Sequence, residues 1–536
     1  MAVTTWQGDD GSSPTDWGTA ANWDTGSVPD GTSDVVIPDC SSIGNCILDG
    51  DTTINSLQIQ GNGNFSMNNH DLTIDGENGS GRAIDIGNNT VTFVGGTGTL
   101  IFTLGSGATN LVGIEHLAAS TELRNLQFNG AATFVLGGAM TVNGNLTITA
   151  GTLSTSGDNN YALTVTGKTE IDDGGTLTCN ASTVSLGSGQ RENWYALLVK
   201  HNGVFAGGTG THTVGSFAVY SGGTATLTSD VMTIDSEHSV DNLSYNNSAS
   251  GTLNHGSGTV TLTYAGESRL ESGNDSLNNL IINHSSADID LYNEALTCAG
   301  DLTITAGELN TGSDVALTVT GDVSVTGTLT GNASAISMGS LTIASGGTYS
   351  ATSGTTTLTT GNATYSAEGN FALVGGGTFT HNNGTLVFDS VGQRLPKGGT
   401  FYNVTLTGSQ TTGGLYLYSS VLSPAGIMPD GTTGANYISI LGTLTITDDE
   451  LRPYNVDKIY VHNLIIGDGT GSANSAKFDM AEADGFDGTV FVDNVTIHSD
   501  GQLLFGDGDE TSATVGSSAL NIYGAFRNLG GNVTIE

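Results

Sequence analysis

The segment "GNLTITAGTL" at residues 144–153 returns almost unchanged as "GDLTITAGEL" at residues 300–309. Two further pairs of segments repeat in the same order along the chain: "ALTVTG" at 162–167 and 316–321, and "GTLTCNAS" at 175–182 with "GTLTGNAS" at 327–334. The spacing shrinks slightly from pair to pair, as expected if turns lose a residue while strands keep their register. Self-similarity at a long period is typical of repeat architectures.

Inside these repeats, short segments such as "LTITAG" alternate an apolar residue with Thr or Ser. This period of two predicts half-buried β-strands of four to six residues. Gly, Asn or Asp closes nearly every strand, and these residues tolerate the positive φ that tight corners demand. Helical periodicity is almost absent. We therefore expect an all-β protein.

An asparagine followed by a short apolar strand recurs in "RNLQF" (124–128), "DNLSY" (241–245), "NNLII" (278–282), "YNVTL" (402–406), "HNLII" (462–466) and "DNVTI" (493–497). Related cassettes therefore fall near 98–257 and 258–383. Unbroken strand spacing, rare proline and no blade signature favour a solenoid over a sandwich or a propeller. We predict a right-handed parallel β-solenoid in which each asparagine stacks at a corner and bonds the neighbouring coil, while the next residue points inward.

Three of the four tryptophans, Trp6, Trp17 and Trp23, precede the first regular strands. A solenoid exposes its core at each end and needs a cap, which large aromatic plates can provide; a sugar-stacking platform is the alternative. We place an N-terminal cap or attachment segment, which includes Pro29, at 1–60. The solenoid follows at 61–410, and a β-rich continuation or cap at 411–536.

The balance of charge is strongly acidic, with 12 Lys and Arg against 52 Asp and Glu and a formal net charge of -40. The basic residues are scattered, whereas nucleic acid and anionic membranes attract clustered cations. We expect no nucleic-acid partner and, without a long apolar run, no membrane insertion. The start "MAVTTWQGDDG" does not resemble a secretion signal. The charge predicts a solvated, self-repelling surface.

The segment "ENWYALLVKHNG" (192–203) interrupts the polar texture with Trp194, Tyr195, Lys200 and His201. We interpret it as an elaborated loop and a candidate surface contact.

No cofactor is expected, although acidic turns offer weak calcium candidates that do not match an EF-hand loop: Asp484, Asp487, Asp507 and Asp509. Close acidic runs, at Asp172–Asp173 and at 448–450, resemble the carboxylate pairs of glycosidases, but exposed turn carboxylates explain them as well. No catalytic residue is assigned. Cys40 and Cys46 could close a small disulfide loop, but Cys179 and Cys298 argue against a disulfide framework.

The pattern W-x-G…W-x5-W-x4-VP…DVVI, carried by Trp6, Trp17, Trp23 and residues 28–29 and 34–37, resembles the head of repetitive β-rich proteins of bacteriophage virions and bacterial surfaces. The "GTVTL…NLII" cassettes resemble the repeats of the same group. The resemblance implies a tail-fibre-like, tailspike-like or adhesin-like protein, trimeric by analogy.

The absence of a recognisable signal favours a structural rod or fibre on the virion surface. Such a rod would contact other virion proteins and host-surface glycans. A bacterial cell-surface adhesin or surface-layer protein is the first alternative, and a β-helical polysaccharide depolymerase is the second.

Overall fold

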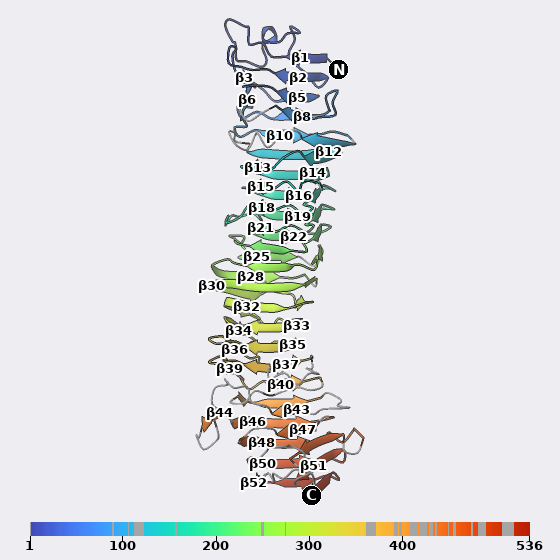
Figure 1. Cartoon of the computed structure of the whole chain (residues 1–536), viewed down its shortest axis with the longest axis vertical. Coiled ribbons are helices and arrows are strands. Elements are labelled where there is room, and N and C mark those ends of the chain that lie inside the picture. Colours follow the sequence, from blue (N-terminus) through green and yellow to red (C-terminus); the bar gives the residue numbers. More distant parts are fainter. Residues whose placement is uncertain are drawn as a thin grey trace. The chain divides into compact units, whose positions relative to one another are not determined.

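The computed structural model describes residues 2–535 except for 88–90, 106, 112–122, 156–157, 248–250, 274, 361–370, 391–394, 396–398, 408–414, 418–425, 428–432, 435–436, 449, 454–456, 473–474, 481–488 and 506–518. Its regular elements are β-strands, apart from the short 3-10 helix η1 (Ala20–Asn22). The chain divides into two compact units: residues 1–264 with 268–278, and 265–267 with 279–536. In each unit the strands stack as successive rungs (Figure 1).

The first unit begins with short columns of parallel strands. One column holds β1 (Ala2–Thr5), β2 (Ser33–Ile37), β5 (Ser56–Ile59) and β8 (Ile84–Ile86), and another holds β3 (Cys46–Ile47), β6 (Asn64–Ser66) and β9 (Thr92–Val94).

Three longer columns follow in the first unit, and each coil of the chain supplies one strand segment to each column. The first runs through β4 (Thr52–Ile54), β7 (Leu72–Ile74), β10 (Thr99–Phe102), β12 (Asn125–Leu136), β14 (Leu146–Ser154), β16 (Thr169–Ile171), β19 (Leu197–Val199), β22 (Phe217–Val219) and β25 (Leu243–Asn247). The second runs through β11 (Ala108–Leu111), the later halves of β12 and β14, β17 (Thr176–Thr178), β20 (Val204–Ala206), β23 (Thr224–Thr226) and β26 (Thr252–Asn254). The third holds β13 (Met140–Val142), β15 (Leu163–Val165), β18 (Val184–Leu186), β21 (His212–Val214), β24 (Val231–Ile234) and β27 (Thr259–Leu262). The strands β28 (Gly266–Glu271) and β29 (Ser276–Leu277) come next along the chain.

The second unit repeats this arrangement. Its first column holds β30 (Asn279–Leu291), β32 (Leu302–Asn310), β33 (Leu317–Val325), β35 (Ile336–Ile343) and β38 (Phe371–Leu373). Its second continues from β30 and β32 through β34 (Thr328–Thr330), β36 (Thr348–Ser350) and β39 (Thr378–Thr380). Its third runs from β31 (Leu296–Cys298) through β33 and β35 to β37 (Thr355–Leu358), β40 (Thr385–Phe388), β42 (Asn403–Leu406), β46 (Tyr437–Ile446), β48 (Lys458–Ile466), β50 (Thr489–Ile497) and β53 (Phe526–Asn528).

The C-terminal part of the second unit adds two more parallel columns. One joins β41 (Thr400–Phe401) to β46, β48, β50 and β52 (Ala519–Ile522), and the other holds β43 (Leu415–Leu417), β47 (Glu450–Pro453), β49 (Ala476–Asp479), β51 (Gly501–Phe505) and β54 (Asn532–Ile535). Only β44 (Gly426–Ile427) and β45 (Thr433–Gly434) form an antiparallel strand pair among the described ladders. The predicted all-β parallel solenoid is confirmed, while its handedness stays a prediction.

The repeated segment that opened the sequence forms equivalent strands in the two units. "LTITAGTLS" is β14 and "LTITAGELN" is β32, each nine residues long, with its Leu and Ile positions buried and its Thr positions less so. The inward residues stack on those of neighbouring coils, such as Leu153 on Leu177 and Leu309 on Leu329, which are all 0% exposed. The core of each unit is therefore built of ladders of like residues.

The asparagine corners predicted from the sequence are confirmed at Asn125, Asn279, Asn403 and Asn494, whereas Asn242 Oδ1 accepts from Arg191 instead. Asn145 N–H donates to Asn125 Oδ1, 20 residues earlier, at 3.2 Å, and Lys168 N–H donates to Asn145 Oδ1, 23 residues earlier, at 3.0 Å. In the second unit Asp301 N–H donates to Asn279 Oδ1 at 2.9 Å. The side-chain oxygen thus accepts a backbone N–H of the next coil. The apolar residue after the recurrent asparagines is buried, as expected: Leu126, Leu280, Val404, Leu464 and Val495.

A glycine at the corner inside β14 and β32 meets two local demands. Gly151 and Gly307 have φ of +68° and +83°, and an added Cβ would lie 2.2 Å from Gly130 O or 2.5 Å from His284 O. Both the left-handed backbone and the close approach of the neighbouring coil exclude a side chain there. Most other residues with positive φ that are not glycine are asparagines and aspartates, as the strand-closing pattern predicts.

Candidate functional site

The three N-terminal tryptophans form one buried cluster. Trp6, Trp17 and Trp23 are 1%, 1% and 2% exposed, and the Trp23 ring meets the other two edge-on at centroid distances of 5.0 Å and 4.6 Å. The Trp17 ring lies 5.9 Å from Phe65 of β6, which packs on Phe93 of β9. The indoles continue the aromatic ladder of the following coils, so their faces are not available for stacking on a sugar.

Hydrogen bonds fix the orientation of two of these rings. Trp6 Nε1 donates to Gly44 O at 2.8 Å, and Trp23 Nε1 donates to Trp17 O at 2.8 Å. Pro29, the fourth member of the predicted segment, is also buried. Burial and packing on the first coils fit a cap, while end closure and attachment stay predictions.

The structure does not bring the four candidate contact residues of 192–203 together, since Tyr195 joins one cluster and Lys200 and His201 join another. Tyr195 is 4% exposed, and its ring lies 4.6 Å from His238 and 5.9 Å from Tyr220. It forms a small apolar cluster with Ala218 and Leu243, separate from the ladders of the core. Trp194 is half-buried beside it in sequence, whereas Lys200 and His201 follow β19 and join a charged cluster.

That charged cluster is an ion-pair network across neighbouring coils. Lys200 Nζ lies 2.7 Å from Glu170 Oε1 and 3.2 Å from Asp172 Oδ2, and Lys168 also binds Glu170. His201 Nδ1 lies 2.8 Å from Asp172 Oδ1. Burial alone would raise the pKa of each carboxyl group, but the hydrogen bonds from lysine outweigh it, so the pKa of Glu170 and of Asp172 lies below its ordinary value. A carboxyl group that acts as a general acid needs a raised pKa, whereas the pKa of both Glu170 and Asp172 is lowered.

The loop 187–196 joins β18 to β19, and the loop 235–242 joins β24 to β25. Hydrogen bonds connect these two loops directly, because the coil between them has only residues 215–216 between β21 and β22. Glu237, which is 0% exposed, accepts a hydrogen bond from Arg191 Nε at 2.5 Å and another from Tyr264 O–H at 3.0 Å. The carboxylate raises the pKa of Arg191, because it stabilises the charged guanidinium. The Arg191–Glu237 pair therefore links the two loops, although these residues are 46 positions apart in sequence.

The four aspartates considered as calcium ligands all lie outside the described residues, so that calcium prediction is untouched: Asp484, Asp487, Asp507 and Asp509. Among the residues described, one group has metal-ligand spacing, formed by Asp172, Asp173 and His201. Lys200 already supplies a cation to Asp172 in that group. Of the acidic run 448–450, Asp449 is not described, and Glu450 lies 4.0 Å from Lys477.

The Cys40–Cys46 disulfide considered above is absent, since all four cysteines are free and buried. Cys40 Sγ accepts Asn64 N–H at 3.3 Å, which gives that thiol a partner within the fold. Burial raises the pKa of Cys46, and it raises the pKa of Cys298 to about 12. These thiols are therefore structural rather than reactive.

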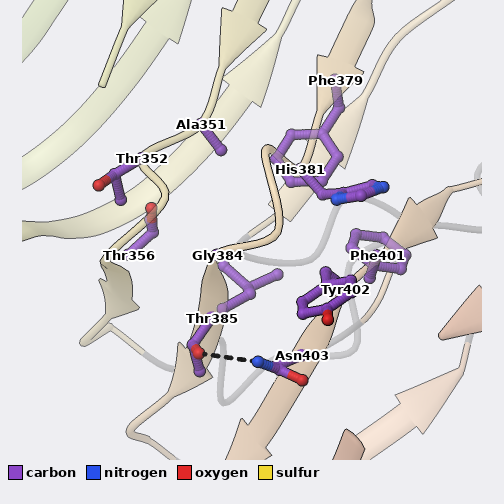
Figure 2. A pocket seen from close by; sticks show the side chains of 11 residues that line it. Ala351, Thr352, Thr356, Phe379, His381, Gly384, Thr385, Phe401, Tyr402 and Asn403 are labelled. Atoms are coloured by element: carbon purple, nitrogen blue, oxygen red, sulfur yellow. Dashed lines mark hydrogen bonds between the residues drawn. The ribbon is translucent and has the colours of Figure 1, made fainter. Parts of the chain in front are cut away.

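A hollow at a corner of the second unit has no counterpart in the sequence predictions. Its free volume is only about 10 Å³, room for roughly one water molecule, and it lies where β36, β39 and β41 turn into β37, β40 and β42. Figure 2 shows the rings of Phe379, His381, Phe401 and Tyr402 around it, with Thr385 and Asn403 below them joined by a hydrogen bond. Among the described residues that line this hollow, none is acidic and none is a lysine or arginine.

The hollow forms because the ladder is interrupted below β39. Among the described strands, β39 pairs on one side only, with β36. Its inward residue Phe379 is half-buried, whereas the residues above it in the same ladder, Tyr349 and Leu329, are 0% exposed. Among the described strands, none pairs with the lower side of β39.

The chain matches no family model, no curated protein and no solved structure. Within the described part of the chain, none of the helices has the length and hydropathy to cross a membrane. The fold thus defines the class, a parallel β-solenoid, and the function has to be argued from the surface and its sites.

Proposed function

We propose that this chain is a structural component of a bacteriophage virion, exposed on the particle, that contributes to adhesion to the host surface. The observation that carries the proposal is the ladder itself. In both units nearly every strand stacks on an equivalent strand of the next coil, so each unit presents a polar surface around a core of stacked side chains. Repeat stacking of this kind suits a scaffold that presents a surface.

The chemistry of the surface supports the same proposal. Outward positions carry mostly Thr, Ser and Asn, and the formal net charge of -40 keeps such a surface hydrated and non-aggregating. The buried tryptophan cluster gives the N-terminal segment a fixed shape suited to attachment. The resemblance of this segment and of the cassettes to virion and bacterial-surface proteins favours one of these two settings, and fold alone does not decide between them.

The test is to locate the chain. Mass spectrometry of purified phage particles should detect it at a fixed ratio to the capsid protein, and gold-labelled antibody should mark one structure on intact particles. Detection in the cell-envelope fraction but not in particles would favour the bacterial adhesin instead. Release of reducing ends from host polysaccharide by the purified chain would point to the depolymerase and contradict a purely structural role.

A further inference from the structure

We propose that His212 is an acid-sensitive switch inside the ladder of the first unit, and that protonation of its ring opens the coil that carries β21. The proposal concerns the fold itself and does not depend on the virion role. His212 is 0% exposed, and it is the only buried one among the histidines that the structure describes. Every residue from 158 to 247 is described, so the surroundings of the ring are defined.

The His212 ring occupies an inward position of the third column, where the other coils place apolar side chains. Its ladder partners on the two neighbouring coils are Val184 and Met232, which are 0% and 1% exposed. The Phe205 ring of the same coil lies 6.1 Å from the imidazole ring, measured between centroids. In such surroundings a neutral ring is tolerated, whereas a charged ring loses its hydration.

One ring nitrogen of His212 has a hydrogen-bond partner and the other has none. His212 Nε2 lies 2.7 Å from Gly207 O, so in the neutral ring the proton is on Nε2. His212 Nδ1 is buried and makes no hydrogen bond to any described residue. Protonation would add an N–H at Nδ1, and the adjacent Thr211 carbonyl already accepts Val184 N–H at 3.2 Å. The charged ring would therefore be a buried cation with a poorly matched donor.

The polar groups around His212 do not offset the cost of burying its charge. Burial lowers the pKa of His212, although the carbonyl groups of Gly207 and Thr211 and the carboxylate of Asp230 act to raise it. Asp230 Oδ2 is also engaged, since it accepts a hydrogen bond from the Thr211 hydroxyl at 2.8 Å. The Cys179 thiol of the neighbouring coil stays uncharged, because burial raises its pKa. The closed coil thus holds the neutral ring.

The direction of the pH effect follows from the lowered pKa. Above the ordinary histidine pKa of about 6.5, the ring is neutral in both the closed and the opened coil, so opening does not depend on its protonation. Below that pH, the opened coil binds a proton that the closed coil excludes, so opening becomes easier as pH falls. Because each coil of a solenoid contacts only its neighbours, the opening can stay local to β18, β21 and β24.

The experiment measures amide hydrogen exchange of the full chain at several pH values between about 7.5 and about 5, with peptides that report β18, β21 and β24. After correction for the intrinsic exchange rate, the opening constant at β21 should rise by up to about tenfold for each pH unit below about 6.5. Peptides from β33 in the second unit serve as the internal reference and should not show this step.

Two variants that cannot be protonated test the assignment to His212. His212→Gln keeps an amide donor for Gly207 O, and His212→Leu fills the ladder position with an apolar side chain. Each should abolish the acid-dependent rise at β21, whatever its stability at neutral pH. His255→Gln, at a half-buried histidine on a turn of the same unit, is the matched control and should keep the rise.

A rise at β21 that persists in both His212 variants would overturn the assignment to this ring. Equal protection of the parent's β21 amides across the whole pH range would overturn the switch without any variant, so the proposal stays testable if a variant fails to fold. A rise of equal size at β33 would also contradict it, because a general response of the acidic chain would then explain the result.

Discussion

At the scale of single residues, the fold depends on a few polar side chains that join one coil to the next. Asn125 and Asn145 each accept a backbone N–H from the following coil, and Asp301 does the same for Asp322 N–H at 2.8 Å in the second unit. Asparagine and aspartate are interchangeable in this role because both present an acceptor oxygen on a short stem. The corner therefore requires an acceptor rather than an amide.

Replacing Asn145 with alanine should remove the acceptor of Lys168 N–H and lower stability by about 0.5–1.5 kcal/mol. Asn145→Asp is the matched control, since it retains the oxygen that Asp301 uses at the equivalent corner, and it should cost less. Urea denaturation followed by circular dichroism gives both values. Equal losses for the two variants would show that the amide nitrogen, not the oxygen, carries the interaction.

Lys200→Met should expose the pH dependence of the charged cluster. The pKa of Glu170 and of Asp172 is depressed in the folded state, so the lysine contribution is fully present above the ordinary carboxyl pKa of about 4.5. It is lost as pH falls through the lower, folded-state pKa. We expect the parent to exceed the variant in stability by about 1.5–3 kcal/mol at neutral pH, and the two to converge below pH 4.

Thermal melts of the two proteins between pH 3 and pH 7 check this convergence. Lys477→Met serves as the control, because Lys477 Nζ lies 4.0 Å from Glu450 and its side chain is 36% exposed. Exposed pairs of that kind contribute about 0–1 kcal/mol, so its melts should follow those of the parent. A parent–Lys200→Met gap that widens in acid would contradict the assigned sign.

At the scale of elements, one sequence pattern yields one strand geometry in two places. β14 and β32 share length, burial pattern and a corner glycine because their sequences share the same alternation and the same Gly position. The tryptophan cluster is different, since it has no second copy and ends the ladder of Phe65 and Phe93 with indoles. The three indole rings pack as one unit, because the Trp23 ring contacts both of the others edge-on.

Trp23→Ala should remove the central ring of that cluster and lower stability by about 3–5 kcal/mol, the usual cost of truncating a large buried aromatic. Trp194→Ala, at a half-buried ring in the loop before β19, should cost much less. Differential scanning calorimetry separates the two. If Trp23→Ala kept both stability and assembly and lost only glycan binding, the cap interpretation would be wrong.

At the scale of the whole molecule, the dominant property is the excess of negative charge. A formal net charge of -40, with only 12 basic residues, makes the folded chain repel itself. Long ladders of uncharged Thr, Ser and Asn hold the structure against this repulsion, because their hydrogen bonds and the packed interior do not depend on charge. Salt that screens the repulsion between these negative charges should therefore stabilise the folded state.

Raising the salt concentration from about 0.01 M to about 0.15 M shortens the Debye length from about 30 Å to about 8 Å. The melting temperature should rise by a few degrees over this range. Sodium chloride and choline chloride should act alike, because the effect is general screening. A steady fall in melting temperature with salt would contradict it, and a larger rise with calcium at matched ionic strength would indicate specific binding by acidic turns.

The sequence by itself determined the local structure of this protein. Alternation of apolar residues with Thr or Ser fixes which side chains point inward, and Asn, Asp and Gly fix the corners, because a period of two and a positive φ are properties of adjacent residues. The asparagine corners were predictable for this reason, and the tryptophans were assigned to a cap because a solenoid exposes its core at each end. The tertiary structure alone decided which distant residues meet: Tyr195 with His238, Arg191 with Glu237, and the rings around the hollow below β39. Coils of unequal length set those neighbours, and a strand pattern does not record how long each loop must be to stack one coil upon another.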